Sequence, residues 1–336
     1  MTRRVFFWKS GDSRLMEDFR VDADTQVPRR QMAAVFEYTA FAEIVRAAQA
    51  NPCDWLQESL RDTLGTLMEP ILLDLDLARR IEHAEARAGA AAAEGLALAR
   101  PSSGAAVERI AGGYANFAGS GSPITQAVGL GLEGSVSREE FVRLESFYRE
   151  RGEPVRAEVC PLADASLFEH FAAGGYRVTE FSNVMVRALP AAGIAANGNE
   201  IAVKRATGTE IDLWNLVVAQ GFSENAPVNR EILEIMKVFA VADGVECYLA
   251  KVDGQPAGGG TLSVRDGVAG LFGASTLPAY RNRGVQTALL NARLARAAEL
   301  GCNLAACLAQ PGSSSQRNVV RQGLQTLYTR LKFEKP

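Results

Sequence analysis

The sequence contains few of the residues that build metal or disulfide sites. Its 336 residues include only two histidines and five cysteines, and no two cysteines form a CxxC pair. Structural zinc sites and disulfide frameworks need closely spaced ligands, so these counts argue against both. The scattered cysteines fit a reducing cytosol, and we therefore expect a cytoplasmic protein that holds no metal.

An excess of charge of one sign and long apolar runs are also missing. The 36 basic and 39 acidic residues leave a net charge of −3 at pH 7, which provides no general basic surface for nucleic acid or an anionic membrane. No segment approaches the roughly 18 uninterrupted apolar residues of a membrane-spanning helix. The apolar run in "MTRRVFFWKS" is too short for the core of a secretory signal. We therefore expect neither nucleic acid nor a membrane as partner.

The remaining composition is that of a globular protein. With 47% hydrophobic residues, the chain can bury a full core, and its length suggests two domains. Residues 1–31 are polar and lack periodicity, which predicts a disordered arm or an over-extended start, with Met32 as the first residue of the fold. The alanine-rich run "AGAAAAEGLALA" is broken by Glu94, and we expect it to form a helix surface or a hinge.

Two segments of the chain repeat one plan. Residues 147–181 and 296–328 each show a helix end, a glycine, a strand, a proline, a short helix, a glycine and a strand. The matching landmarks are Gly152 with Gly301, Pro161 with Pro311, and Gly175 with Gly323. In each copy a short strand upstream leads into a long helix. The pattern predicts two copies of one α/β unit of roughly 150 residues each.

The order of elements is clearest in the second copy. A segment at 189–200, rich in Gly, Ala, Pro and Asn, indicates a linker between the copies. After it we expect a strand at 201–205, helices at 209–220 and 230–241, and three strands joined by Asp-Gly turns. A long helix, a strand at 303–308, a short helix after "PGSSSQRN" and a strand at 325–333 complete an α/β unit with a largely antiparallel start.

The long helix of the second copy begins without a cap. In "LPAYRNRGVQTALL" (277–290), no Ser, Thr, Asp or Asn precedes the first turn with Glu or Gln three residues later. We expect the N–H groups from Arg283 to Ala288 to be free at the positive end of the helix, where they could bind a pyrophosphate. Gly284 lets a ligand approach the backbone, and Arg281 and Arg283 add charge.

The first copy provides an internal comparison, because its equivalent helix is capped. Ser137 and Glu140 in "GSVSREEF" form a capping box, which satisfies the same N–H groups with side chains. Glu133 also places negative charge where a phosphate would bind, and no arginine precedes Gly134. We therefore expect one anion site per chain, in the second copy.

On these residues the second copy resembles the GNAT superfamily of acetyl-CoA-dependent N-acetyltransferases. The signature of that family is Gln/Arg-x-x-Gly-x-Gly/Ala, and "RNRGVQ" matches it at Arg281 and Gly284 but has Gln286 at the last position. Asn318 matches the asparagine that often follows the fifth strand of the family. The resemblance implies that acetyl-CoA, as cosubstrate, is held by Phe272, Ala274, Thr276, Arg281, Arg283, Gly284, Val285, Gln286, Thr287 and Asn318.

The same resemblance implies the fold and the reaction. It suggests two tandem GNAT-like domains, each a mixed, mainly antiparallel sheet flanked by helices. The first, at 32–188, would be degenerate, and the second, at 201–336, would bind acetyl-CoA. The acceptor would be a primary amine, either of a small molecule or of a peptide N-terminus, and the protein would be a monomer or a homodimer.

The catalytic acid and base are harder to assign. Many members of the family use a tyrosine on the helix after the fifth strand, whereas here Tyr328 falls on the following strand, as either the acid or a core residue. For the base we favour Glu224 over Glu246 and Asp266. Cys307 lies in mid-strand, which is typical of a small buried hydrophobe. The alternative function is a non-catalytic acyl-CoA-binding or scaffold protein, which would bind acetyl-CoA without consuming it.

Overall fold

The computed structural model describes residues 3–8, 16–21, 71–189, 201–223, 227–228 and 230–335. The chain divides into two compact units, residues 1–69 and 70–336. In the first unit, strands β1 (Arg3–Trp8) and β2 (Met16–Val21) pair antiparallel. The rest of the expected arm at 1–31, and the expected linker from residue 190 on, lie outside the described residues, so both boundaries stay predictions.

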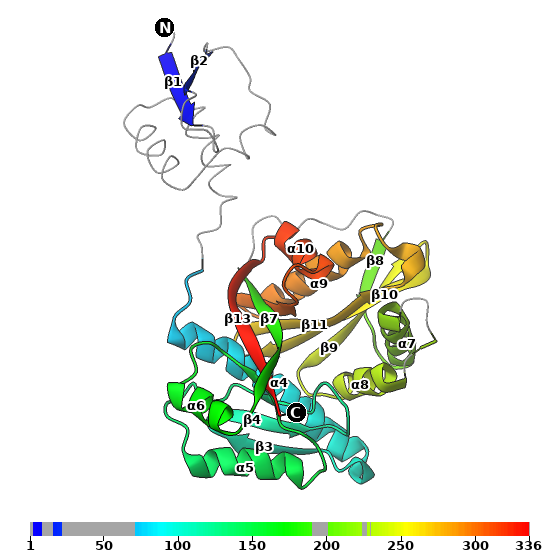
Figure 1. Ribbon diagram of the computed structural model, residues 1–336. Helices are drawn as coiled ribbons and strands as arrows, with labels where there is room; N and C mark the ends of the chain where they lie inside the picture. The colour runs from blue at the N-terminus through cyan, green and yellow to red at the C-terminus, as the bar shows by residue number, and fades with distance from the viewer. Residues whose placement is uncertain are drawn as a thin grey trace. The chain divides into compact units, whose positions relative to one another are not determined.

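The second unit contains both copies of the repeat (Figure 1). The first half consists of α4 (Leu75–Ala99), the short η1 (Pro101–Ser103), β3 (Ala106–Ile110), β4 (Gly113–Phe117), β5 (Ala127–Val128), α5 (Arg138–Arg149), β6 (Arg156–Val159), α6 (Ala165–Ala173) and β7 (Arg177–Ala188). The second half begins with β8 (Ile201–Arg205), α7 (Glu210–Ser223), α8 (Arg230–Ala240), β9 (Val245–Val252), β10 (Gln255–Arg265) and β11 (Val268–Thr276). It ends with η2 (Pro278–Tyr280), α9 (Val285–Glu299), β12 (Leu304–Ala309), α10 (Ser314–Arg321) and β13 (Gln325–Glu334).

The predicted repeat is confirmed in the order of these elements. The series β5, α5, β6, α6, β7 matches the series β11, α9, β12, α10, β13. Within each series the first two strands pair parallel, as expected for a strand, helix, strand crossover. Gly152 and Gly301, which follow α5 and α9, both have positive φ, at 72° and 77°. A glycine there ends each helix without the cost that a side chain would add.

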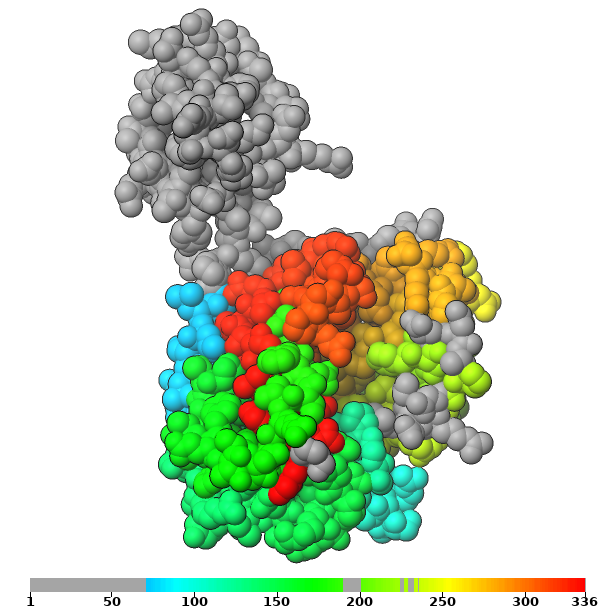
Figure 2. Space-filling view, viewed as in Figure 1, coloured from blue at the N-terminus to red at the C-terminus, as the bar shows by residue number. Residues whose placement is uncertain are grey.

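The two halves share one sheet, and this corrects the expectation of a separate sheet in each. The strand order is β3-β4-β5-β6-β13-β7-β12-β11-β10-β9-β8, 11 strands in all within the described residues. The last strand of the second half, β13, lies between β6 and β7 of the first half, while β7 in turn pairs with β12 of the second. In Figure 2 the red C-terminal strand is accordingly visible among the green residues of the first half. Each half therefore depends on a strand from the other.

The helices divide between the two faces of this sheet. Alternation along β7 defines the faces, because Met185 packs on the side of α9, whereas Val184 and Val186 pack on the side of α4. Along β13, Phe333 joins the core under α5 and α6, while Tyr328 faces α4. Helices α5, α6, α9 and α10 thus cover one face, and α4, α7 and α8 cover the other.

Helix α4 is the alanine-rich segment, and its environment corrects the expectation of a helix surface or hinge. Residues 90–93 are alanines with at most 5% exposure, so the small side chains allow close packing rather than solvent contact. The helix contacts β3, β4 and β5 of the first half as well as β10, β11 and α8 of the second. It therefore connects the halves across one face. Of the helices in the described part of the chain, none has both the length and the apolar character needed to cross a membrane.

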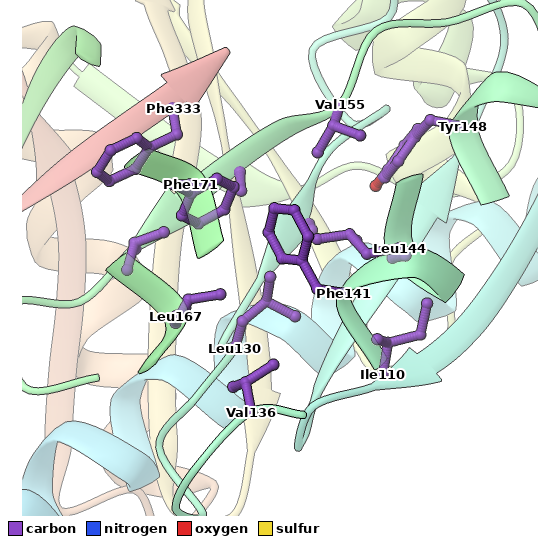
Figure 3. Close-up of a cluster of buried hydrophobic side chains, with 14 of the residues drawn as sticks. Ile110, Leu130, Val136, Phe141, Leu144, Tyr148, Val155, Leu167, Phe171 and Phe333 are labelled. Atoms are coloured by element: carbon purple, nitrogen blue, oxygen red, sulfur yellow. The ribbon is translucent and has the colours of Figure 1, made fainter. Parts of the chain in front are cut away.

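The core of the first half includes a residue from the end of the chain. Phe333 of β13 lies among Leu167, Phe171 and other side chains of α5 and α6 (Figure 3). Its ring stacks on that of Phe171 with a centroid distance of 4.5 Å and an interplanar angle of 5°. Phe333 is only 9% exposed. The hydrophobic core of the first half is therefore incomplete without the last strand of the second.

We predict that Phe333→Ala lowers the free energy of unfolding by about 3–5 kcal/mol, because it removes a buried ring and leaves a cavity. Urea unfolding followed by circular dichroism measures this loss. Phe181→Ala is the control, since Phe181 lies on β7 of the same sheet but is 53% exposed. Its effect should stay below about 1 kcal/mol. A separate unfolding transition for residues 71–189 would contradict the shared sheet.

Candidate functional site

Strands β11 and β12 separate along their length. Residues 268–270 pair with residues 304–306, and the parallel ladder then stops. Beyond that point β11 still pairs with β10 on its other side, and β12 still pairs with β7. The facing edges of residues 271–276 and 307–309 therefore have no strand between them in the described chain. A peptide-like ligand could bond to such an edge, which agrees with the expectation for this strand.

A cavity of about 480 Å³ lies on the α4 face at this separation. Its size is within the range of small-molecule sites. Most of the lining is apolar, from α4, β7, α7, α8 and β11, and includes Ile81, Ile124, Val184, Phe222, Met236, Phe239 and Phe272. The polar lining residues are Glu85, Asn116, Gln126, Ser263 and Cys307. The two halves of the chain thus build the cavity together.

A β-bulge interrupts β11 beside the cavity. Gly259 pairs with Ser275 and Thr261 pairs with Phe272, so Gly260 alone faces both Gly273 and Ala274. Gly273 has φ +56° and lines the cavity. A bulge leaves a backbone group without its ladder partner and redirects it. The bulge thus interrupts the regular ladder of β11 at the edge of an apolar space.

The start of α9 confirms the prediction of an uncapped helix. Its N-cap is Gly284, which has φ +83°, and no side chain of the described chain caps it. The free donors are fewer than expected, because the N–H of Ala288 already donates to the carbonyl of Gly284 at 2.9 Å. The positive end of α9 thus has its first N–H groups available for an anion, up to that of Thr287. By contrast, the predicted capping box of Ser137 and Glu140 is present on α5.

The two arginines of the motif differ in their contacts. Arg281 donates to the carbonyls of Thr276 at 3.4 Å and Gly221 at 3.2 Å, so it also connects the end of β11 to α7. Arg283 is exposed, lies over the ring of Tyr280 at 5.6 Å and is 3.5 Å from the carboxylate of Asp253. Arg283 is thus a charge near the helix start that contacts the side chains of Tyr280 and Asp253, whereas Arg281 bonds to backbone carbonyls, a structural role that the sequence did not indicate.

The other residues of the expected cofactor site fall into two groups. Phe272 lines the cavity, Ala274 belongs to the bulge, and Thr276 accepts a hydrogen bond from the amide of Gln286 at 2.9 Å. Val285 begins α9 with its side chain in the core, and Thr287 is exposed on the first turn. These residues lie on β11 or at the start of α9. Asn318 is on α10, exposed and hydrogen-bonded to Arg321, and it does not line the cavity.

Of the two expected catalytic side chains, only Tyr328 lies in the described part of the chain, and it does not line the cavity. Glu224 lies outside the described residues. The hydroxyl of Tyr328 donates to Glu82 at 2.6 Å in a buried cluster, and Tyr328 is not among the cavity lining. Burial beside Glu82 raises the pKa of Tyr328. The core interpretation of Tyr328 therefore fits its environment, and we do not assign it as the acid.

The other residues considered for catalysis are Glu246, Asp266 and Cys307, and each has a different environment in the structure. Glu246 pairs with Arg205 at 3.2 Å and Arg296 at 3.3 Å. Although burial opposes it, the hydrogen bonds of Glu246 with Tyr248 and Arg296 hold its pKa below the ordinary value. Asp266 is in the turn between β10 and β11. Cys307 does line the cavity, but burial raises the pKa of its thiol to about 12, which disfavours the thiolate.

A buried ionic cluster lies under the cavity. The fully buried guanidinium of Arg330 on β13 contacts Glu82 at 2.7 Å, Glu85 at 2.8 Å and Glu158 at 3.2 Å. Burial raises the pKa of Glu82, although the charge of Arg330 opposes this. One cation thus faces three carboxyl groups. Of the four side chains only Glu85 lines the cavity.

The sequence analysis did not predict several of these features. Gly273 was detectable, since a glycine inside a strand pattern is a signal of a bulge. Glu85 and Asn116 carry no motif, and both belong to the half that was expected to be degenerate. The spacing of Glu82 and Glu85 on one helix face was the available signal, but it does not reveal which strand they face.

Comparison with known proteins finds a family match within the second half. Residues 212–323 match the model of the Acetyltransferase (GNAT) family. A GCN5-related N-acetyltransferase from Kribbella flavida matches in structure with 15% identity and a TM-score of 0.55, over 75% of this chain and 95% of that one. At this identity the likeness shows a shared fold. No curated protein of known function matches the sequence.

Two further solved structures are less similar. A tandem GNAT protein from the clavulanic acid biosynthesis pathway matches with 16% identity and a TM-score of 0.48, over 68% of this chain and 82% of that one. The aminoglycoside N-acetyltransferase AAC(6')-Iy in complex with CoA matches with 22% identity and a TM-score of 0.31, over 38% of this chain and 89% of that one.

The raised pKa of Glu82 makes the stability of the protein dependent on pH. Above the ordinary glutamate pKa, the unfolded chain releases the proton that folded Glu82 still holds, so stability falls as pH rises through the raised pKa. We predict that Glu82→Gln, which keeps an acceptor for Tyr328 and Arg330, reduces this loss. Urea unfolding between about pH 5 and pH 8 measures how the free energy of unfolding changes with pH in each protein.

Glu94→Gln is the control for this experiment, because Glu94 is on the same helix but its side chain is 51% exposed. Its stability should follow the parent protein at every pH. A Glu82→Gln profile that runs parallel to the parent would show that Glu82 is ionised in the folded protein.

Proposed function

We propose that this chain, whose residues 212–323 belong to the GNAT acetyltransferase family, is an N-acetyltransferase that transfers an acetyl group from acetyl-CoA to a primary amine. The observation that carries the proposal is the uncapped start of α9 next to the separated strands β11 and β12. The uncapped helix start, the unpaired edge of residues 271–276 and the apolar cavity support the proposal as places for the phosphates, the pantetheine arm and the reacting groups.

The residues present fit acetyl-CoA at three points. The first N–H groups of α9 and the side chain of Arg283 suit the negative pyrophosphate. The free edge of residues 271–276 suits the amide groups of the pantetheine arm, which can bond to a strand edge as a peptide does. Gly284, with φ +83°, leaves the backbone at the helix start open to a ligand.

When bound, acetyl-CoA supplies a thioester: its carbonyl carbon bonds to the acceptor nitrogen, its C–S bond breaks, and one proton of the amine leaves with the sulfur as free CoA thiol. The backbone N–H groups at the bulge of β11 are the chain's own donors for a carbonyl oxygen that gains negative charge. The apolar lining excludes water around them, which strengthens such a hydrogen bond. No side chain needs to be charged for this role.

The first half is proposed to hold no acetyl-CoA. Its equivalent helix α5 is closed by Ser137 and Glu140, whose side chain accepts from the N–H of Ser137 at 2.9 Å. Glu133 pairs with His83 of α4 at 3.3 Å. The first half instead provides α4 and β4 to the wall of the cavity.

Calorimetry and a turnover assay test the proposal together. Titration with acetyl-CoA should give one site per chain, and a panel of primary amines should release CoA thiol. Binding without thiol release for any amine would favour the non-catalytic acyl-CoA-binding alternative. No binding, or two sites per chain, would contradict the assignment of the α9 start as the one cofactor site.

We predict that Thr287→Asp weakens acetyl-CoA binding by about tenfold or more while the protein becomes as stable as the parent or slightly more so. A carboxylate on the first turn interacts favourably with the helix dipole, by about 0.3–1 kcal/mol, but it repels a pyrophosphate at the same place. Calorimetry measures the affinity, and thermal unfolding measures the stability.

Thr287→Asn is the matched control, because it has nearly the same shape without the charge. It should bind acetyl-CoA within a few-fold of the parent. Replacement of Gly284 is a poorer test, since φ +83° strains any side chain placed there. If Thr287→Asp binds acetyl-CoA as the parent does, the helix start is capped by water alone.

A further inference from the structure

The described side chains around the cavity favour one kind of acceptor. We propose that the acceptor is a small primary amine with an apolar body and no anionic group, and that Glu85 binds its ammonium group while Asn116 accepts a hydrogen bond from it. Before the transfer the ammonium releases one proton to solvent at the partly exposed Glu85, which leaves a neutral nitrogen with the lone pair that bonds to the thioester carbon. This inference rests on the proposed function, because it names the acceptor of the same reaction. Both residues belong to the first half, so that half would select the acceptor.

The first argument is an imbalance of charge. Arg330 is the one cation among Glu82, Glu85 and Glu158, and these contacts are 2.7–3.2 Å long. Even with Glu82 neutral, the carboxylates of Glu85 and Glu158 share one guanidinium, which leaves one net negative charge next to the fully buried Arg330. Such a charge is costly unless a cation balances it. Glu85 is 35% exposed and lines the cavity, so a cation in the cavity can reach it.

Other cations of the described chain do not balance this charge. Glu85 is the only charged side chain among the described residues that line the cavity. The buried guanidinium of Arg293 approaches the sheet from α9, on the opposite face, and donates to the carbonyls of Leu289 and Thr261. This guanidinium lies against Gly260, and its N–H groups already donate to those backbone carbonyls. The cation that Glu85 lacks can therefore come from a ligand.

The second argument is independent and concerns Asn116. This residue is 2% exposed and lines the cavity, and its side-chain oxygen is buried without a hydrogen-bond partner in the described chain. Buried amide oxygens are nearly always satisfied, because an unmade hydrogen bond costs free energy. An ammonium or amine N–H is a suitable donor. Asn116 thus provides an acceptor on β4 in addition to the carboxylate on α4.

The rest of the lining limits the body of the acceptor. Ile81, Ile124, Met236 and Phe239 offer apolar contact to an alkyl or aryl group. An acceptor with its own carboxylate would be repelled by Glu85 and would find no cationic side chain in the described lining. A polyhydroxylated amine would leave hydroxyl groups without partners against these side chains. The geometry thus favours a simple alkylamine or arylalkylamine.

The first experiment compares two amines of similar shape. Phenethylamine and phenylalanine differ by one carboxylate, and their acetylation is followed through release of CoA thiol. We expect kcat/KM for phenethylamine to exceed that for phenylalanine by about 10- to 100-fold, as for a charge-assisted contact. Calorimetric titration of the protein with phenethylamine alone gives a readout that does not depend on turnover.

The second experiment uses variants of the site. Glu85→Gln should raise KM and Kd for phenethylamine by about 10- to 100-fold while the Kd for acetyl-CoA stays unchanged. Glu94→Gln, on the exposed side of the same helix, should behave as the parent. Asn116→Ala should raise KM by a smaller factor. A KM effect that is absent for acetyl-CoA separates amine recognition from a general loss of structure.

Specific results would overturn the inference. Equal acetylation of phenylalanine and phenethylamine, or an unchanged KM and Kd in Glu85→Gln, would remove Glu85 as the ammonium site. If Glu85→Gln does not fold, Ala88→Leu decides, since Ala88 lines the cavity on α4 and a larger side chain should exclude phenethylamine without affecting acetyl-CoA. A parent protein that binds phenethylamine but not acetyl-CoA would reject the proposed function and leave the amine site standing.

Discussion

The pairing of β7 with β13 is the interaction on which the rest of the structure depends. These two antiparallel strands are the last of their halves, and each also pairs with a strand of the opposite half. As a result, two copies of one α/β unit share one sheet and cannot separate without breaking backbone ladders on both sides. The core around Phe171 and Phe333 is shared in the same way.

The shared sheet explains how the first half reaches the site of the second. Because both halves present the same face to α4, this single helix can extend from the strands of the first half to β10, β11 and α8. Its small alanine side chains allow a close approach, and the separation of β11 from β12 leaves space under it. The cavity is therefore a property of the joined halves, although the uncapped start of α9 belongs to the second half alone.

The charges are divided between the two halves in the same way. The helix start at Gly284 is positive and uncapped, which suits the phosphates of a nucleotide cosubstrate. In the cavity, Glu85 is the charged side chain of the described lining, and it belongs to the cluster around Arg330. Arg330 comes from the last strand and its carboxylate partners from the first half, so the strand exchange also builds this cluster. A site with a positive and a negative end suits a transfer from an anionic donor to a cationic acceptor.

The sequence by itself determined the local features. The glycine and proline landmarks predicted the repeat, the Asp-Gly turns predicted the hairpins, and "RNRGVQ" predicted an uncapped helix start, because each depends on neighbours within a few residues. Only the tertiary structure decided that the two sheets are one, that Tyr328 faces Glu82, and that Glu85 and Asn116 line the cavity. These facts depend on strand order, which joins residues about 170 positions apart, as in the pairing of Leu331 with Val159, and no local pattern encodes that pairing.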